Sequence, residues 1–385
     1  MKRIILKTFH GLIFILYIFL YFISFPPAYI LYKRKHIWLI SEVYFDARDN
    51  GYHFFKYLND NYKTINSVYI ISKKNKYFGK INKIGKSVEP GSYKHLLYFI
   101  ASDYKIATLT HGCSPSYYLT LFLLKFHPTG KNISLKHGVF KNIHPNYFKK
   151  NAHLDMICCG GLPEYEFIRD NFGYKNSVAK YTGLARFDNL HNHINENCIL
   201  IMPTWRRTLD GVDEESFVSS LYFTQWTTLL KKIIDAVPTD FQIYYYVHHK
   251  MNKYVHLFRE DFSNISFINS ADGDDLQTYL MKCKLFITDF SSTFFDIAYM
   301  KKPAIYFQFD EEEYYKTHYE KAYFDYNENG FGPVVDNVDD CIVIIKNVLM
   351  NDCKVSEQYL KRINEFFTIN DNNNCKRIFD EIIKL

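Results

Sequence analysis

Cysteine is scarce in this chain of 385 residues, which contains only eight. Cys158 and Cys159 are adjacent within an apolar run, and no C-x-x-C pair is present. Zinc ribbons and disulfide-stabilised secreted domains both need closely spaced cysteine pairs, so neither class is indicated. A reducing compartment is the simpler expectation.

A strong net charge is lacking too, because 47 basic and 41 acidic residues leave a balance of only +6. That balance suits an anionic substrate or an anionic membrane surface, but it is too weak to argue for nucleic acid. No convincing Asp-x-Asp pair for metal-dependent nucleotide-sugar chemistry is found, since Asp272–Asp275 precede a predicted helix and read as capping residues. We therefore expect chemistry without a metal or a cofactor.

One long hydrophobic run is present, at Gly11–Tyr32, and basic residues flank it on both sides. It has no small-residue cleavage site, so it is a poor secretory signal. Pro26 and Pro27 leave about 15 unbroken apolar residues, fewer than the roughly 20 that a spanning helix needs. The run predicts membrane attachment, either as a single-pass anchor or as an in-plane segment held by anionic lipid. A buried hairpin packed on the body of the protein is the alternative.

From His36 onward, short apolar strands alternate with helices, which is the pattern of doubly wound parallel sheets. A polar stretch at 191–197 divides this pattern into two series. We therefore expect a membrane-associating segment at 1–35, an N-terminal Rossmann-like domain at 36–192 and a C-terminal Rossmann-like domain with terminal helices at 193–385. The strands are expected at 37–40, 67–72, 104–107, 131–135, 156–159, 198–202, 241–247, 265–268, 285–288 and 304–307.

The stretch 285–306 reads as strand, turn, helix and strand. Asp289 ends the first strand, and Ser291 and Ser292 then offer hydroxyl and N–H groups at the start of a helix. A helix N-terminus at the carboxyl end of a parallel strand favours phosphate. The alternative is that the two serines are only a good helix cap.

Three further motifs follow predicted strands. His137 and Gly138 suit a general base with space for substrate beside it, although a structural histidine is an equal alternative. Thr204 and Arg206 follow a strand of the second series, where Arg can clamp a phosphate or simply be solvated. His248 and His249 end another strand, and only one of two adjacent side chains is expected to face a ligand. The acidic and aromatic segments at 311–314 and 324–326 read as a solvated face.

Taken in order, these motifs resemble the CDP-glycerol glycerophosphotransferase family, which includes teichoic-acid polymerases and their capsule relatives. The resemblance covers roughly His36 to Asp340. The motifs that carry it are His137-Gly138, Gly183–Asp188, Pro203–Arg206, a strand-end His, Thr288–Ser292, Phe295-Asp296, Lys302-Pro303, Phe309-Asp310 and Gly332-Pro333.

The resemblance implies a GT-B fold of two facing Rossmann-like domains at the cytoplasmic face of the cell membrane. It also implies transfer of a polyol phosphate from CDP-glycerol, or a related CDP-polyol, to a hydroxyl of a lipid-linked or polymeric glycan acceptor, with release of CMP. His137 then matches the base. The donor-binding positions are Thr204, Arg206, His248 or His249, Asp289, Ser291 and Ser292, and the substrate-positioning ones are Gly138, Lys141, Arg186 and Asp296.

The sequence departs from the family pattern in two places. Leu135-Lys136 precedes the His-Gly where an aromatic residue is common, and His248–Lys250 stands where a His-Pro is common. Two other functions stay open: a GT-B glycosyltransferase that uses a nucleotide sugar, and a non-catalytic membrane-anchored partner of a polymer-export machine. The polyol, the acceptor and the oligomeric state are not specified by the sequence.

Overall fold

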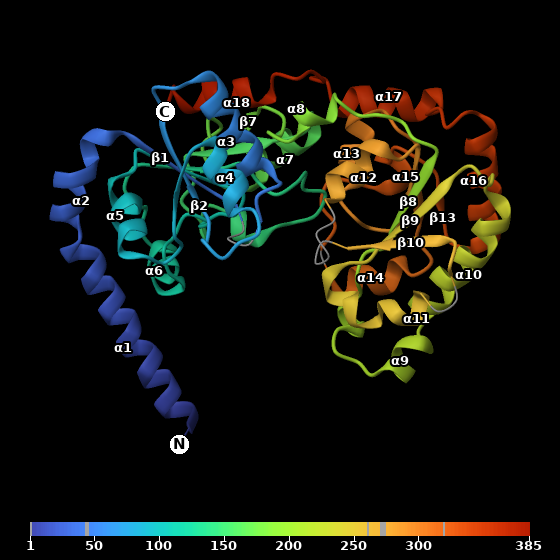
Figure 1. Cartoon of the computed structure of the whole chain (residues 1–385), viewed down its shortest axis with the longest axis horizontal. Coiled ribbons are helices and arrows are strands. Elements are labelled where there is room, and N and C mark those ends of the chain that lie inside the picture. Colours follow the sequence, from blue (N-terminus) through green and yellow to red (C-terminus); the bar gives the residue numbers. More distant parts are fainter. Residues whose placement is uncertain (1, 43–45, 260–261, 270–274, 319) are drawn as a thin grey trace. The chain divides into compact units, whose positions relative to one another are not determined.

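The computed structural model describes residues 2–42, 46–259, 262–269, 275–318 and 320–385, with side chains from His10 onward. The chain forms two compact units, each built on a parallel sheet (Figure 1). Unit 1 contains Met1–Val139, His144–Asp188 and Asp371–Leu385. Unit 2 contains Phe140–Ile143 and Asn189–Asn370.

Unit 1 is organised around a seven-stranded sheet of order β3-β2-β1-β4-β5-β6-β7. All of its pairings are parallel, so helical connections must return the chain to the same edge. The strands are β1 (Ile37–Ser41), β2 (Asn66–Ile70), β3 (Lys86–Val88), β4 (Tyr104–Ala107), β5 (Lys131–Ser134), β6 (Met156–Cys159) and β7 (Ala179–Tyr181). Its connecting helices are α3 (Asn50–Asn61), α4 (Phe78–Ile84), α5 (Tyr93–Ala101), α6 (Tyr117–Leu123) and α7 (Leu162–Asn171).

Both faces of this sheet are covered, which explains why its strands read as continuous apolar runs. In β1, Trp38 and Ile40 belong to the core on one face, and Ile37 and Leu39 belong to the core on the other. Because successive side chains of a strand point to opposite faces of the sheet, this single strand contributes residues to two separate cores.

The N-terminal apolar run forms two helices, α1 (Lys2–Ile23) and α2 (Phe25–Tyr32), which part at Ser24 just before the two prolines. α1 contacts α6, and α2 contacts α5. No single described helix has the length and hydropathy needed to cross a membrane; the bent pair His10–Ile23 and Phe25–Lys35, with 41° between its arms, qualifies by length and composition alone.

Unit 2 is organised around a six-stranded parallel sheet of order β10-β9-β8-β11-β12-β13. The strands are β8 (Cys198–Met202), β9 (Gln242–Tyr246), β10 (Ile265–Ile268), β11 (Leu285–Thr288), β12 (Ala304–Phe307) and β13 (Val334–Val335). Its helices are α9 (Glu214–Val218), α10 (Leu221–Ala236), α11 (Val255–Arg259), α12 (Leu276–Lys282), α13 (Phe294–Tyr299), α14 (Glu311–Thr317), α15 (Tyr326–Asn329), α16 (Val338–Met350) and α17 (Glu357–Phe366).

The stretch 285–306 has the predicted order of strand, turn, helix and strand, but its helix is short. α13 has only six residues, and its N-cap residue Thr293 makes no side-chain cap hydrogen bond. Ser291 Oγ instead lies 2.8 Å from Thr293 Oγ1. Lys302 is buried and donates to the carbonyl oxygens of Leu280, Met281 and Cys283, so it fixes the end of α12 against this element.

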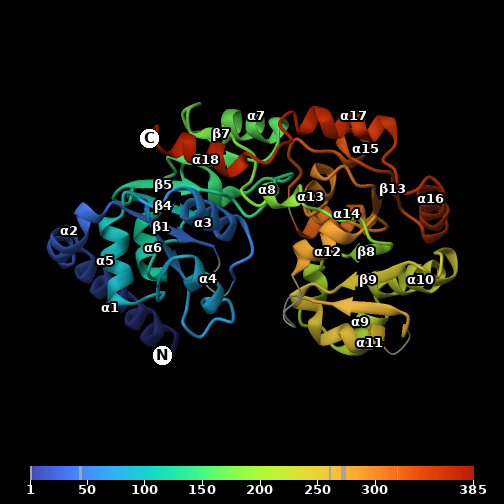
Figure 2. The ribbon, with the colours of Figure 1, turned by 45° about the horizontal axis from the view of Figure 1, so that its top comes forward.

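The units differ from the predicted domains at three places. Helix α8 (Phe187–Leu190) spans the division, and the last helix, α18 (Asn374–Ile382), packs in unit 1 beside α3 rather than with the preceding helices of unit 2 (Figure 2). The short segment 140–143 belongs to unit 2 although the chain on both sides of it belongs to unit 1. The placements of α18 and of the segment 140–143 depend on contacts between residues far apart in the sequence, which local patterns do not report.

Candidate active site

The predicted base His137 lies beyond the carboxyl ends of the unit 1 strands, three residues after β5 ends. Its ring Nδ1 is 2.5 Å from Asp49 Oδ2, and three quarters of its side chain is exposed. Asp49 is the N-cap residue of α3, yet its carboxylate does not cap the helix. When Nδ1–H donates to Asp49, the lone pair of the neutral ring lies on Nε2, the nitrogen that a base uses.

Arg186 and Asn50 hold this histidine loop in place. Arg186 NH1 donates to Asp49 Oδ1 at 2.9 Å and also to the carbonyl oxygen of His137. Asn50 Nδ2 donates to the carbonyl oxygen of Lys136 at 2.8 Å, and Asn50 Oδ1 accepts the Arg186 backbone N–H at 2.9 Å. The predicted residues His137 and Arg186 are therefore brought together by Asp49 and Asn50. The sequence did not reveal a role for either of these two side chains.

The pKa values in this cluster follow from its charges. The attraction of Asp49 raises the pKa of His137. Burial would raise the pKa of Asp49, but His137 and Arg186 outweigh it and lower that pKa to about 2. Burial, followed by repulsion from Asp49, raises the pKa of Glu42 to about 7. Glu42 accepts the N–H groups of Arg48, Asp49 and Tyr52 and thereby shapes the loop that carries Asp49.

The unusual Lys136 has a structural explanation. Its ammonium forms an ion pair with Glu164, and both side chains are completely buried. Glu164 also accepts the Gly160 N–H at 2.6 Å. Lys136 itself adopts a left-handed backbone conformation with φ of 55°, which turns the chain sharply just before His137. Lys136 thus anchors the loop that presents the base.

In unit 2, the predicted Arg206 is buried and fully engaged. Its Nε and NH2 donate to the two carboxylate oxygens of Asp310 at 2.7 and 2.9 Å, and NH2 lies 2.8 Å from Asp289 Oδ2. NH1 donates to the carbonyl oxygen of Thr204 at 2.7 Å. Burial would lower the pKa of Arg206, but the two carboxylates raise it. In this geometry Arg206 organises the strand ends, and Asp310 is a second partner whose role was not predicted from the sequence.

Asp289 connects the ends of β8 and β11. Its Oδ1 accepts the backbone N–H groups of Thr204 at 2.8 Å and of Phe290 at 2.6 Å. Ser291 and Ser292 follow it, with Ser292 exposed, and Asp296 is buried on α13. The prediction that the segments 311–314 and 324–326 form a solvated face is wrong in part. Tyr314, Phe324 and Tyr326 are buried aromatic residues, and Tyr314 stacks on Phe290 at 3.9 Å between ring centroids.

The two strand-end histidines differ, as expected for adjacent residues. His248 stacks on Trp205 at 6.0 Å, and its Nδ1 accepts the Lys250 N–H at 3.3 Å, whereas His249 is exposed. Burial, followed by the neighbouring His249 and Lys250, lowers the pKa of His248 to about 4. A ring with that pKa is neutral near pH 7 and can bind phosphate as a hydrogen-bond donor but not as a cation.

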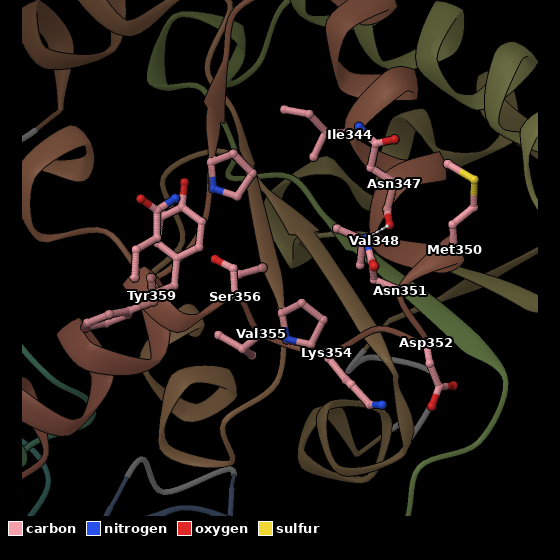
Figure 3. A pocket seen from close by; sticks show the side chains of 16 residues that line it. Ile344, Asn347, Val348, Met350, Asn351, Asp352, Lys354, Val355, Ser356 and Tyr359 are labelled. Atoms are coloured by element: carbon pink, nitrogen blue, oxygen red, sulfur yellow. Dashed lines mark hydrogen bonds between the residues drawn. The ribbon is translucent and has the colours of Figure 1, made fainter.

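Metal ligands are not grouped in the described residues, where no set of three or more His, Cys, Asp or Glu side chains is arranged to hold an ion. Asp275 caps α12 by accepting the Gln277 N–H at 3.2 Å, while Asp272–Asp274 lie outside the described residues. A cavity of about 830 Å³ lies near the starts of β12 and β13 (Figure 3). This cavity lies at the amino ends of the strands, whereas Asp289 lies at their carboxyl ends. The charged residues of the cavity, Asp352 and Lys354, are exposed. A hydrogen bond from Asn351 Nδ2 to the Asn347 carbonyl oxygen lies in its wall.

Comparison with known proteins adds sequence relatives to this geometry. The chain is 29% identical over 382 residues to the minor teichoic acid biosynthesis protein GgaB of Bacillus subtilis, covering 93% of this chain and 41% of that protein. It is 23% identical over 290 residues to a teichoic acid poly(glycerol phosphate) polymerase of the same organism, covering 71% of this chain and 36% of the relative. The chain thus spans about two fifths of the length of these relatives.

Solved structures support the fold. The wall teichoic acid polymerase TagF superposes with a TM-score of 0.68 at 16% identity, over 91% of this chain and 89% of that one. A UDP-N-acetylglucosamine 2-epimerase from Listeria monocytogenes superposes with a TM-score of 0.58 at 14% identity, over 89% of this chain and 95% of that one. The sequence model of one family matches residues 23–384, nearly the whole chain. The chain belongs to the CDP-glycerol:poly(glycerophosphate) glycerophosphotransferase family.

Proposed function

We propose that this protein transfers glycerol phosphate, or a related polyol phosphate, from a CDP-activated donor to a hydroxyl of a cell-surface glycan acceptor. The acceptor is polymeric or linked to a lipid, and the product belongs to a teichoic-acid-like or capsular polymer. The observation that carries this proposal is the Asp49–His137 pair, which leaves Nε2 of an exposed ring as the basic nitrogen. The family membership of the chain supports the same reaction.

The reaction needs a base, a bound donor and little covalent chemistry from the protein. His137 Nε2 takes the proton of the acceptor hydroxyl, and the imidazolium that forms is stabilised by Asp49. The acceptor oxygen attacks the phosphorus nearer the polyol. The bond from that phosphorus to the bridging oxygen breaks, and CMP leaves.

Unit 2 is the proposed donor-binding unit, within a fold of GT-B type. Arg206 orders the strand ends through Asp289 and Asp310, and the phosphates are assigned to groups beside it: Thr204, Ser291, Ser292 and neutral His248. His249, being exposed, is the weaker candidate of the two histidines. Gly138 and Arg186 are assigned to the acceptor side with His137, and Asp296 supports the turn from α13.

The acceptor is assigned to unit 1. A cavity of about 640 Å³ in that unit is lined by polar groups that include Glu42, His111 and Asn151, and by the apolar residues Leu121 and Leu124 of the α6 region. Glu42 accepts the Asp49 N–H, so the polar end of this cavity adjoins the loop that orients His137. A polar wall next to an apolar one suits a molecule with both characters, such as a lipid-linked glycan.

Membrane attachment is proposed through the same side of unit 1. Exposed apolar residues recur along α1 at Leu12, Ile15, Leu16 and Phe19, the spacing of one helical face. The opposite face packs on α6, where Tyr17 stacks on Tyr118 at 5.8 Å between centroids. A helix packed lengthwise on a globular unit with its other face apolar suits in-plane insertion at the cytoplasmic surface. The basic run Lys33–Lys35 adds attraction to anionic lipid.

The decisive experiment measures CMP release from CDP-glycerol in the presence of a glycerol-phosphate acceptor. His137→Ala is expected to lose about 10²- to 10⁴-fold in kcat, the usual contribution of a general base. His127→Ala is the matched control, because His127 is another exposed histidine of unit 1 paired with a carboxylate, Asp155. Full activity in folded His137→Ala would refute the proposal, and a product resistant to hydrofluoric acid would indicate glycoside formation instead.

A further inference from the structure

A short segment that follows the loop of His137 places a lysine, Lys141, in unit 2. Phe140–Ile143 begin three residues after His137 but belong to unit 2. Asn142 forms an antiparallel bridge with Lys321, and the Ile143 N–H donates to the Glu320 carbonyl oxygen at 3.2 Å. These backbone contacts place the side chain of Lys141 inside unit 2.

Lys141 is buried there, and its amine has no hydrogen-bonding partner among the described residues. Only 4% of the residue is exposed, and its Nζ makes no hydrogen bond to the described residues. The groups that face it are the Tyr326 ring, 5.4 Å from Nζ, the carboxylate of Asp289 and the ammonium of Lys321. Burial of an amine without a partner is costly, and a ligand that accepts from the amine would offset that cost.

Two further residues that interact with Asp289 carry buried hydroxyls that make no hydrogen bond to the described residues. Thr204 Oγ1 makes no hydrogen bond to the described residues, although the Thr204 N–H donates to Asp289 Oδ1. Tyr326 OH is likewise without a described hydrogen bond, and the charge of Asp289 acts on it. Arg206 does not offer a positive charge to a bound anion, because the carboxylates of Asp289 and Asp310 already balance its charge.

We infer that Lys141, together with Thr204 and Tyr326, forms an anion subsite in unit 2 that takes a phosphate oxygen of the CDP moiety, and that the lysine gains a proton when the anion binds. This inference rests on the proposed function and deepens it, because it names the cation that Arg206 does not provide. The charged oxygens of a phosphate group accept from such donors more strongly than an uncharged sugar hydroxyl does.

The titration of Lys141 supports proton uptake. Burial lowers the pKa of Lys141 to about 7; Asp289 partly offsets this effect and Lys321 adds to it. At pH 8 most of the amine is therefore neutral in the free protein, and a bound phosphate dianion would restore the charged form. The amine of Lys141 binds its proton more tightly in the unfolded chain than in the folded chain. Lys141 therefore lowers the stability of the fold, and this loss grows as the pH falls from the ordinary pKa of lysine toward 7.

The first test compares stability with affinity in Lys141→Met. Methionine keeps most of the length of the unbranched side chain but removes the buried amine, so the melting temperature at pH 7 is expected to rise by about 2 °C or more. The affinity for CMP and for CDP-glycerol is expected to fall roughly 10- to 100-fold, the effect of one charged hydrogen bond. A fall in melting temperature would mean that the ammonium serves the fold, and would overturn the inference.

The second test counts protons by titration calorimetry at pH 8 in buffers of different ionisation enthalpy. Wild-type protein is expected to take up close to one proton per CMP bound, and Lys141→Met none. Lys316→Met, which removes an exposed lysine of α14, is the control and should match wild type. Equal uptake and affinity in Lys141→Met, or no binding of either ligand by wild type, would overturn the inference. Binding with proton uptake but without CMP release from CDP-glycerol would leave the subsite standing and refute the proposed reaction.

Discussion

At the residue scale, the chemistry depends on side chains that orient other side chains. His137 is held by Asp49 through Nδ1, and Asp49 is held in turn by Arg186 and by its own position at the start of α3. Arg206 plays the corresponding part in unit 2, where it ties Asp289 and Asp310 together. Both clusters bury their supporting charges, which favours a rigid geometry, and the neighbouring opposite charges lower the pKa of Asp49 and raise that of Arg206.

Asp49→Asn tests the orientation of the base. Asp49 raises the pKa of His137, and only the neutral ring accepts a proton, so wild-type kcat/KM should be complete above that raised pKa and fall as the pH drops through it. The asparagine removes the charge, so the acidic limb should move to lower pH. The plateau should drop at least about 10²-fold, because the ring loses its tautomer and its basicity.

The measurement is the pH profile of CMP release, with Asp170→Asn as control. Asp170 is an exposed carboxylate of unit 1 that pairs with its neighbour Arg169, so its loss should leave the profile unchanged. If Asp49→Asn kept the wild-type acidic limb, Asp49 would not set the pKa of the base.

At the element scale, the N-terminal helices combine two interfaces. One face of α1 packs on α6 through rings such as Tyr21 and Phe122, with centroids 6.1 Å apart. The other presents a stripe of exposed leucine, isoleucine and phenylalanine side chains. Water is a poor solvent for such a stripe, so an apolar partner is expected to cover it.

The double substitution Leu16→Glu with Phe19→Glu places two charges in this stripe without touching the packed face. We expect the protein to move from the membrane pellet to the supernatant and to lose binding to vesicles that contain anionic lipid, because charge is excluded from the acyl boundary. Its fold, followed by circular dichroism, should not change. The control is Val343→Glu with Met350→Glu, two equally exposed apolar residues of α16 in unit 2. Unaltered vesicle binding by the first variant would place the attachment elsewhere in the chain.

At the scale of the whole molecule, the sequence predicted each sheet better than it predicted the limits of the units. Apolar runs such as 198–202 and 285–288 match β8 and β11 because strands buried on both faces leave a local signal. His137 and Asp289 were predicted as site residues because ligand-facing residues commonly collect after such strands. Local patterns gave no role to Asp49, since the hydrogen bond that orients His137 joins residues 88 positions apart.

The crossing segments were not predictable for the same reason. Lys141 and α18 each pack in the unit that local patterns do not assign to them. The start of α18 is held by Asp188 of α8. The Asp188 carboxylate accepts hydrogen bonds from the backbone N–H groups of Asn374 and Cys375 and from the Asn374 side-chain amide, at 2.7 to 2.8 Å. Gly183 makes room for this junction, because a Cβ there would overlap Asn374, and its φ of 74° suits glycine. The motif Gly183–Asp188 thus serves the docking of a helix nearly 200 residues later.

That docking makes the last helix part of the core of unit 1, and the two isoleucines Ile378 and Ile383 test it. Ile378 is completely buried against the core that also contains Trp38 and Ile40, whereas Ile383, just beyond α18, is 54% exposed. Ile378→Ala should lower the free energy of unfolding of unit 1 by about 2 to 5 kcal/mol, and Ile383→Ala should change it little. Hydrogen exchange should therefore quicken in β1 and α3 but not in β8 or β11, because residues 371–385 belong to unit 1. Faster exchange in β8 and β11 with unchanged β1 would contradict this assignment of the terminal helix.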